Sequence, residues 1–118
     1  RKFGRIINIS SIFGVVSKSG RSLYSVTKFG LIGLTKSSAL DLAKYNILVN
    51  SVSPGVIKTK LTKSILNPNQ LSKIKQEIPL KRLGEVSDVS NLVCFLCSDL
   101  NNYITGQNFI IDGGYTAK

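Results

Sequence analysis

The sequence has no histidine, no tryptophan and no methionine, and only two cysteines, in 118 residues. Without histidine, the chain has too few nitrogen and sulfur ligands for a zinc site, and we expect no metal. No apolar run approaches the roughly 20 residues that a membrane-spanning helix needs. Acidic residues are also scarce: six Asp and Glu against sixteen Lys and Arg give a formal charge of +10. The apolar content is ordinary, which predicts a folded globular domain rather than a disordered chain.

The amino-terminal residues resemble a secretory signal only faintly. Asn8, Ser10 and Ser11 interrupt the apolar run, and no clean cleavage site follows. We therefore expect a cytoplasmic protein. The absence of an initiator methionine indicates either processing or a piece of a longer protein.

A basic chain can bind nucleic acid, anionic lipid or phosphorylated ligands. Here the lysines are scattered, and no run of adjacent basic residues is longer than two. No clustered basic face with interleaved aromatics and no known nucleic-acid-binding motif accompanies them. We expect neither a nucleic acid nor a membrane as a partner.

Cys94 and Cys97 form a CxxC inside the apolar segment NLVCFLCSDL. A redox CxxC belongs at an exposed helix N-terminus, where the thiolate is favoured. The sequence instead predicts two buried core thiols in a reducing compartment.

The chain is divided into strand-length and helix-length segments. Short β-branched runs bounded by Gly, Ser or Pro predict strands at residues 5–9, 48–53 and 108–112. Longer segments predict helices at residues 24–45 and 85–98. Strands separated by helices imply parallel pairing, so the predicted fold class is α/β with a three-stranded parallel sheet.

The segment at residues 61–77 is polar, has helical patches and contains Pro68. It predicts a mobile flap, at about residues 60–78, rather than part of the core. A parallel sheet of three strands is thin, and its first edge has no neighbour, which indicates truncation. We therefore expect residues 1–118 to form a single partial domain.

Open parallel sheets bind ligands outside the carboxyl ends of their strands. Ser10 and Ser11 follow the first predicted strand, and Pro54 and Gly55 follow the second. The helix after the first strand begins at the same edge of the sheet. Tyr24 and Lys28, in its first turns, are therefore expected to lie near Ser11.

Tyr24 and Lys28 share one helix face, about 6 Å apart along the axis. A free phenol is a poor base at neutral pH because its pKa is near 10. An exposed ammonium contributes ~1 kcal/mol or less, so activation needs a desolvated site with a second positive charge, such as an oxidised nicotinamide ring. The spacing alone is weak evidence, since about 0.4 such pairs are expected by chance. Each residue alone also has an ordinary structural interpretation: a packed aromatic, a solvated lysine and, for Ser11, a cap or turn serine.

The motifs occur in the order IINISSIFG, YSVTK, LVNSVSPGVIKT, PLKRLGEVSDVSNLVCFLCSD and ITGQNFIIDGG, over nearly all of the chain. In this order and spacing, they resemble the C-terminal half of the short-chain dehydrogenase/reductase family. The resemblance is strongest to its 3-oxoacyl-[acyl-carrier-protein] reductase-like branch. Ser11 stands thirteen residues before Tyr24, as the catalytic serine of the family does, which favours Ser11 over Ser10.

The resemblance implies the C-terminal part of a Rossmann-type doubly wound parallel sheet, with the N-terminal half absent. It also implies hydride transfer between NAD or NADP and a carbonyl or alcohol substrate. Tyr24 would be the general acid/base, Ser11 would polarise the carbonyl, and Lys28 would hold the nicotinamide ribose and favour the phenolate. A further set would line the nicotinamide and phosphate side of the cofactor: Pro54, Gly55, Ile57 and Thr59.

The family's glycine-rich phosphate loop and the residue that selects NAD or NADP lie upstream of the matched part. We therefore expect the chain alone to be inactive, and neither cofactor choice nor substrate is determined. The resemblance implies a small carbonyl or alcohol substrate, carrier-protein-bound ones included, and a homodimer or homotetramer that uses residues 85–114. The alternative that stays open is a truncated, non-catalytic remnant that acts as an interaction or structural module.

Overall fold

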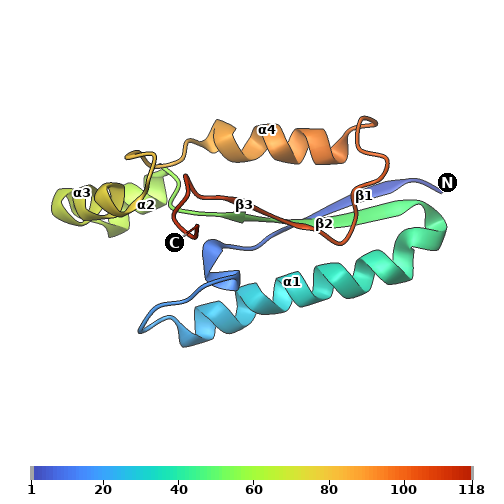
Figure 1. Cartoon of the computed structure of the whole chain (residues 1–118), viewed down its shortest axis with the longest axis horizontal. Helices are drawn as coiled ribbons and strands as arrows, with labels where there is room; N and C mark the ends of the chain where they lie inside the picture. Colours follow the sequence, from blue (N-terminus) through green and yellow to red (C-terminus); the bar gives the residue numbers. More distant parts are fainter. Residues whose placement is uncertain (1, 118) are drawn as a thin grey trace.

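A three-stranded parallel sheet forms the centre of the structure, a computed structural model that describes residues 2–117 (Figure 1). Strand β2 (Ile47–Pro54) lies between β1 (Gly4–Ile9) and β3 (Asn108–Ile111), and both pairs are parallel. Short β-branched runs closed by residues that break strands explain these extended segments. The predicted parallel α/β fold is confirmed, and each strand lies within one residue of its predicted bounds.

The central strand is buried along almost its whole length. Val49 and Val52 have no exposed surface, and neither do the polar residues Ser51 and Ser53. Both serine hydroxyls donate to Asn108 Oδ1, at 2.8 and 2.7 Å. Because buried polar groups without partners are costly, these bonds fix the start of β3 against β2.

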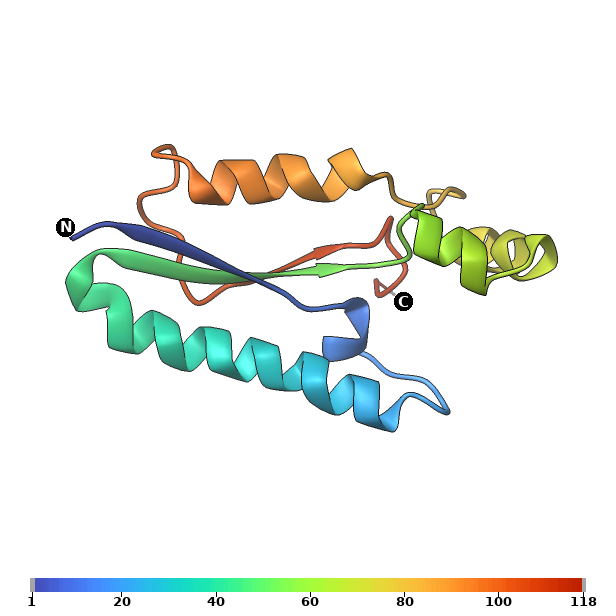
Figure 2. The same ribbon diagram turned by 180° about the vertical axis from the view of Figure 1, so that it is seen from behind.

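Two long helices cover opposite faces of the sheet (Figures 1 and 2). Helix α1 (Ser22–Leu42) follows β1 and continues into the 3-10 turn η2 (Ala43–Tyr45), and Asn46 then reverses the chain with a φ of 56°. Helix α4 (Val86–Cys97) precedes β3. Both connections step the same way across the sheet but run over opposite faces, so the two crossovers have opposite hand.

Two short helices, α2 (Lys60–Ile65) and α3 (Pro68–Glu77), extend beyond the carboxyl ends of the strands (Figure 1). The side chain of Thr59 caps α2, and that of Asn67 caps α3, whose first residue is the proline that the sequence places in this segment. Neither helix has a buried residue. The predicted flap, about residues 60–78, is therefore mostly helical, and its two helices lie outside the core, whereas Ile78 at its end is buried in the core.

The prediction of two buried core thiols is wrong. Cys94 and Cys97 are both free and exposed. The reason is that α4 packs on the sheet with one face only, so that Leu96 is its one buried residue. Apolar side chains such as Phe95 lie on the outer face beside the cysteines, with 40% of Phe95 exposed.

Within residues 2–117, no helix combines the length and the apolar character needed to cross a membrane. In the same part of the chain, no three His, Cys, Asp or Glu side chains are grouped closely enough to hold a metal ion.

Candidate active site

The carboxyl ends of the strands, the start of α1 and the flap lie at the same end of the molecule (Figure 2). A cleft of ≈ 280 Å³ opens between them. It is lined by Ser11 after β1, Tyr24 of α1, Gly55 after β2 and Leu61 of α2. The structure thus brings together residues that are up to 50 positions apart, as parallel strands with a common carboxyl edge dictate. We use the name rim for Ser11 and Tyr24, which line this cleft, together with Lys28, which lies one helical turn after Tyr24.

Ser11 is 8% exposed and occupies the N-cap of the 3-10 turn η1 (Ile12–Gly14). Its Oγ accepts a hydrogen bond from Phe13 N at 3.1 Å. A hydroxyl has one donor and two acceptor positions, so the cap occupies one acceptor only. No acceptor for the hydroxyl hydrogen is recorded within the described residues, and Ser11 can therefore donate to a ligand in the cleft.

Ser10 has a different role from its neighbour. It is 4% exposed, and its Oγ donates to Lys28 O at 2.8 Å, which ties the end of β1 to the backbone of α1. The 3-10 turn η1 also packs against the backbone of α1 at Gly14, where an added Cβ would lie 2.8 Å from Lys28 O. Only glycine allows this approach of loop to helix. The structure therefore places Ser11, and not Ser10, in the cleft.

Tyr24 lies in the first turn of α1 with 45% of its surface exposed. Its ring packs edge-to-face against Phe13, with ring centres 6.2 Å apart and an interplanar angle of 80°. Edge-to-face pairs of this kind are a preferred arrangement of two aromatic rings and favour one ring orientation. The aromatic packing that the sequence allows is present, and the ring is also part of the cleft wall.

Lys28 lies one turn after Tyr24, with Nζ 5.6 Å from the centre of the tyrosine ring. Nζ donates to Ile9 O, the last carbonyl of β1, at 3.2 Å. An ammonium has three donors, so this bond leaves capacity for a ligand. Lys28 does not line the cleft itself but stands behind Tyr24, at the end of β1.

The residues expected to line a cofactor divide between two surfaces. Gly55 lies in the cleft. Pro54, Ile57 and Thr59 instead line an apolar groove of ≈ 390 Å³. The opposite wall of this groove is formed by residues of α4, among them Val86 and Val93. The structure therefore brings only Gly55 of this set into the cleft that contains Ser11 and Tyr24.

The backbone after β2 is held closely by two neighbours. Gly55 N donates to Ile111 O at 2.8 Å, and a Cβ on Gly55 would lie 3.0 Å from Asp112 Cα. Further on, Lys58 N donates to Gly84 O at 2.8 Å. The segment between the cleft and the groove is therefore fixed by β3 on one side and by the loop before α4 on the other.

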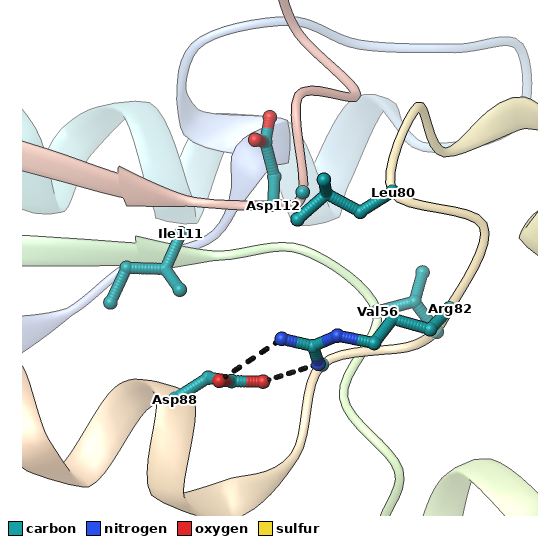
Figure 3. A pocket seen from close by; sticks show the side chains of 8 residues that line it. Val56, Leu80, Arg82, Asp88, Ile111 and Asp112 are labelled. Carbon is teal, nitrogen blue, oxygen red and sulfur yellow. Dashed lines mark hydrogen bonds and ion pairs between the residues drawn. The ribbon is translucent and has the colours of Figure 1, made fainter.

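Arg82, in the loop before α4, forms an ion pair with Asp88 in the first turn of α4 (Figure 3). Arg82 Nη1 lies 2.7 Å from Asp88 Oδ2, and Nη2 lies 3.3 Å from Oδ1. The hydrogen bond from Arg82 lowers the pKa of Asp88, and the carboxylate raises the pKa of Arg82. Asp88 Oδ2 also accepts from Glu85 N at 2.7 Å, so one carboxylate caps α4 and anchors the loop.

Asp112 lies across a ≈ 160 Å³ pocket from this pair, with its carboxylate directed away from Arg82 (Figure 3). It accepts hydrogen bonds from Gly114 N, Thr116 N and Thr116 Oγ1 at 2.7–2.8 Å. Burial opposes ionisation, but these bonds outweigh it and hold the pKa of Asp112 below its ordinary value. Asp112 therefore holds the chain turn after β3 and does not face the cleft.

The sequence analysis did not single out Arg82, Asp88 or Asp112. The two aspartates could have drawn attention because the chain has only six acidic residues. The signal for Asp88 was available: an acid three residues after Glu85 at the start of an apolar helix is typical of a capping box. No sequence signal indicates that Arg82 closes the pair, because the contact depends on the path of the loop.

The sequence matches, over residues 1–116, a family model described as Enoyl-(Acyl carrier protein) reductase. The 3-oxoacyl-[acyl-carrier-protein] reductase FabG of Aquifex aeolicus (strain VF5) is 48% identical over 114 residues, which are 97% of this chain and 46% of that protein. The chain spans about half the length of the curated relatives it matches. The resemblance found in the sequence is thus confirmed.

Solved structures show the same relationship. A 4-hydroxyisoleucine dehydrogenase mutant complexed with NADH and succinate has a TM-score of 0.93 and 44% identity, over 98% of this chain and 48% of its own. The protein ElxO with NADP bound has a TM-score of 0.92 and 38% identity, over 99% of this chain and 48% of its own. Both structures contain a nicotinamide cofactor.

Proposed function

The chain belongs to the short-chain dehydrogenase/reductase family, and we propose that it forms the catalytic, C-terminal half of an NAD(P)-dependent oxidoreductase. The observation that carries this proposal is the rim: the hydroxyl of Ser11 and the phenol of Tyr24 line one cleft, and the ammonium of Lys28 lies 5.6 Å from the centre of the tyrosine ring. A nicotinamide cofactor, when bound, supplies or accepts the hydride. The residues of this chain would hold the substrate carbonyl and move the proton.

In this proposal Tyr24 is the general acid/base. As hydride reaches the carbonyl carbon, negative charge develops on the carbonyl oxygen, and the phenol of Tyr24 gives it a proton. Ser11 donates a hydrogen bond to the same oxygen, which stabilises the developing charge before the proton arrives. The unengaged hydroxyl hydrogen of Ser11 and the exposed phenol of Tyr24 in the same cleft support these roles.

Lys28 has two proposed tasks. The donors of its ammonium that Ile9 O does not occupy would bind the ribose hydroxyls of the cofactor. Its positive charge near the tyrosine ring would favour the phenolate in the reverse reaction. The remaining proposed cofactor contacts lie along the segment after β2, partly through backbone groups: Pro54, Gly55, Ile57 and Thr59.

The proposed substrate is a small carbonyl or alcohol compound, with 3-oxoacyl groups on a carrier protein as the specific candidate. That candidate is supported by the FabG relative, whose name describes this reaction. The 4-hydroxyisoleucine dehydrogenase relative acts on a different alcohol, so family membership alone leaves the substrate class broad. The proposed cofactor is NAD or NADP, and the proposed location is the cytoplasm.

We also propose that the full-length protein is a homodimer or homotetramer that pairs through residues 85–114. Strand β3 lies at a sheet edge, where Ile110 is 41% exposed, and Phe95 of α4 is 40% exposed. Exposed edges and apolar helix faces are liabilities in a monomer. Light scattering of the full-length protein should show a dimer or larger. Ile110→Asp should weaken this assembly, and a clean monomer before substitution would contradict the proposal.

The enzymatic proposal is tested with the full-length protein expressed from its complete gene. Reduced NAD or NADP that carries deuterium at the transferable position is incubated with 3-oxoacyl thioesters and with simple ketones. Deuterium in the alcohol product, measured by mass spectrometry, supports the proposal. No transfer to any of these substrates from a protein with a cooperative unfolding transition contradicts it and favours the non-catalytic remnant.

The role of Ser11 is tested by comparing two serine-to-alanine variants, one in the cleft and one outside it. Ser11→Ala removes the proposed donor to the carbonyl oxygen and should lower kcat by about 100-fold. Ser19→Ala changes an exposed loop serine outside the cleft and should leave the rate unchanged. Since Ser11 also caps η1, Tm is measured for both variants. A loss of Tm without a loss of rate would assign Ser11 to the cap alone.

A further inference from the structure

A pocket of ≈ 310 Å³ lies between α2, α3 and the loop before α4, on the other side of α2 from the cleft. Its walls combine four basic residues, one acid and a partly apolar floor: Lys58, Thr62, Lys63, Leu71, Lys75, Arg82, Leu83 and Glu85. Leu83 is 7% exposed and forms part of that floor. Folding therefore collects cations that are well separated in the sequence around one small cavity.

The charges around this pocket are not balanced. Lys58 pairs with Glu85 at 3.3 Å, and Arg82 pairs with Asp88 at 2.7 Å. For Lys63 and Lys75, no ion pair is recorded within residues 2–117. The two unpaired ammonium groups come from different helices, one from α2 and one from α3.

The surrounding segment makes this imbalance larger. Residues 58–82 contain seven Lys and Arg and a single acid, Glu77. Like charges repel, and Lys63 and Lys75 are both exposed lysines at the wall of one pocket. Neither α2 nor α3 has a buried residue to hold it in place against this repulsion.

We propose that this pocket binds an anion with phosphate or carboxylate oxygens, held between Lys63 of α2 and Lys75 of α3. Oxyanions form strong charge-assisted hydrogen bonds with ammonium groups. A single anion between the two lysines would replace repulsion between α2 and α3 by attraction to a common partner. It would thereby fix the two flap helices to each other and to the loop before α4.

The anion site is connected to the cleft through α2. Thr62 lines both cavities, and its Oγ1 donates to Ile57 O at 2.7 Å. Fixing α2 from the outside therefore also fixes the flap wall of the cleft. The anion site is a separate binding site, and its test needs neither substrate nor turnover.

The test is a titration of the full-length protein with inorganic phosphate at constant ionic strength, in the absence of cofactor and substrate. Isothermal calorimetry gives the dissociation constant, and hydrogen exchange reports the backbone amides of α2 and α3. Saturable binding that slows exchange in both helices is expected. Lys63→Gln with Lys75→Gln together should weaken binding by at least about tenfold.

Matched controls come from the same two helices. Lys60→Gln in α2 and Lys73→Gln in α3 remove equal charge from exposed lysines that do not line the pocket. Each should change the dissociation constant by no more than about twofold at physiological ionic strength, where exposed charges are screened beyond about 8 Å. Equal weakening by the control pair would overturn the site, and so would an absence of saturable binding to the wild-type protein.

A second titration distinguishes the source of the anion. Reduced NAD or NADP is added to protein saturated with phosphate. Competition would identify a phosphate of the cofactor as the group that the pocket takes. Independent binding would identify a free anion or an anionic group of another ligand. Since phosphate binding is measured without catalysis, a failure of the enzymatic proposal leaves this result unaffected.

Discussion

Ser11 and Tyr24 of the rim line the same cleft as α2 of the flap, but the two regions are held in different ways. The rim is joined to the sheet by hydrogen bonds from Lys28 Nζ to Ile9 O and from the neighbouring Ser10 Oγ to Lys28 O, and by the close approach at Gly14. In the flap, α2 and α3 have no buried residue and are held by their caps and by polar contacts such as the bond from Thr62 Oγ1 to Ile57 O. Groups that handle a proton need fixed positions, whereas a wall that admits substrate benefits from freedom to move.

The largest difference should appear in stability. Leu96 of α4 has no exposed surface, and its truncation to alanine should cost roughly 2–5 kcal/mol. The matched change in the flap, Leu61→Ala, removes a side chain that is 67% exposed and should cost ~0.5 kcal/mol or less. Urea unfolding of the full-length protein measures both. Similar losses would mean that the flap belongs to the core, and the comparison would fail.

The next effect concerns the approach of the rim loop to α1. Gly14→Ala introduces a Cβ 2.8 Å from Lys28 O and 2.5 Å from Ser10 Oγ, and should cost about 1–3 kcal/mol. Because the change displaces Ser11 relative to Tyr24, it should also lower kcat. Gly30→Ala is the control: nothing lies within 4 Å of its added Cβ, and a helical alanine should raise stability by about 0.5–1 kcal/mol. If Tm and kcat respond alike to both variants, the close approach has no special role.

A smaller effect is the pH dependence of stability that Asp112 contributes after β3. The pKa of Asp112 is lowered in the folded state, so its contribution to stability is complete above its ordinary value of 3.8 and is lost as the pH falls through the folded value. Asp112→Asn should reduce stability on the order of 1 kcal/mol at neutral pH and flatten the acid limb of the Tm profile.

Asp88 gives the contrast to Asp112. Its pKa is lowered by the exposed Arg82, so its effect has the same sign with pH but should weaken in high salt. The hydrogen bonds of Asp112 are local and should persist in salt. Equal salt dependence of Asp88→Asn and Asp112→Asn would contradict this assignment.

Much of the fold and of the rim could be predicted from the sequence. Strand bounds followed from β-branched runs between Gly, Ser and Pro, since such residues both favour and terminate extended backbone. The meeting of Ser11 with Tyr24 and Lys28 followed from topology, because parallel strands share one carboxyl edge. Their chemical roles stay a prediction, supported by the geometry of the cleft.

Two features were harder to predict, for physical reasons. The apolar circumference of α4 predicted buried thiols, but a helix on one face of a sheet buries one stripe only, and Cys94 and Cys97 lie outside it. The sequence predicts a flap with helical patches around Pro68 but does not place the start of a helix there. Pro68 is the first residue of α3, a position where the missing N–H of proline has no cost.

The basic pocket could not be predicted at all. Lys63 and Lys75 are separated by a turn and by the start of α3, and the sequence shows them only as scattered charges. Their common cavity depends on how α3 packs toward the loop that contains Leu83. No periodic pattern in the sequence indicates this contact. Surface electrostatics of this kind requires the tertiary structure.

The most direct test of the account is Tyr24→Phe in the full-length protein, beside Tyr103→Phe as a control. Both variants remove a single hydroxyl, but Tyr103 is 94% exposed and lies far along the chain from the rim, in the loop before β3. Single-turnover hydride transfer and the dissociation constant of the cofactor are measured for each. Tyr24→Phe should slow transfer by about 100-fold or more while cofactor affinity changes little, and Tyr103→Phe should change neither. If Tyr24→Phe retains more than about a tenth of the rate, a loss below ~1.4 kcal/mol, the general-acid role of Tyr24 is wrong.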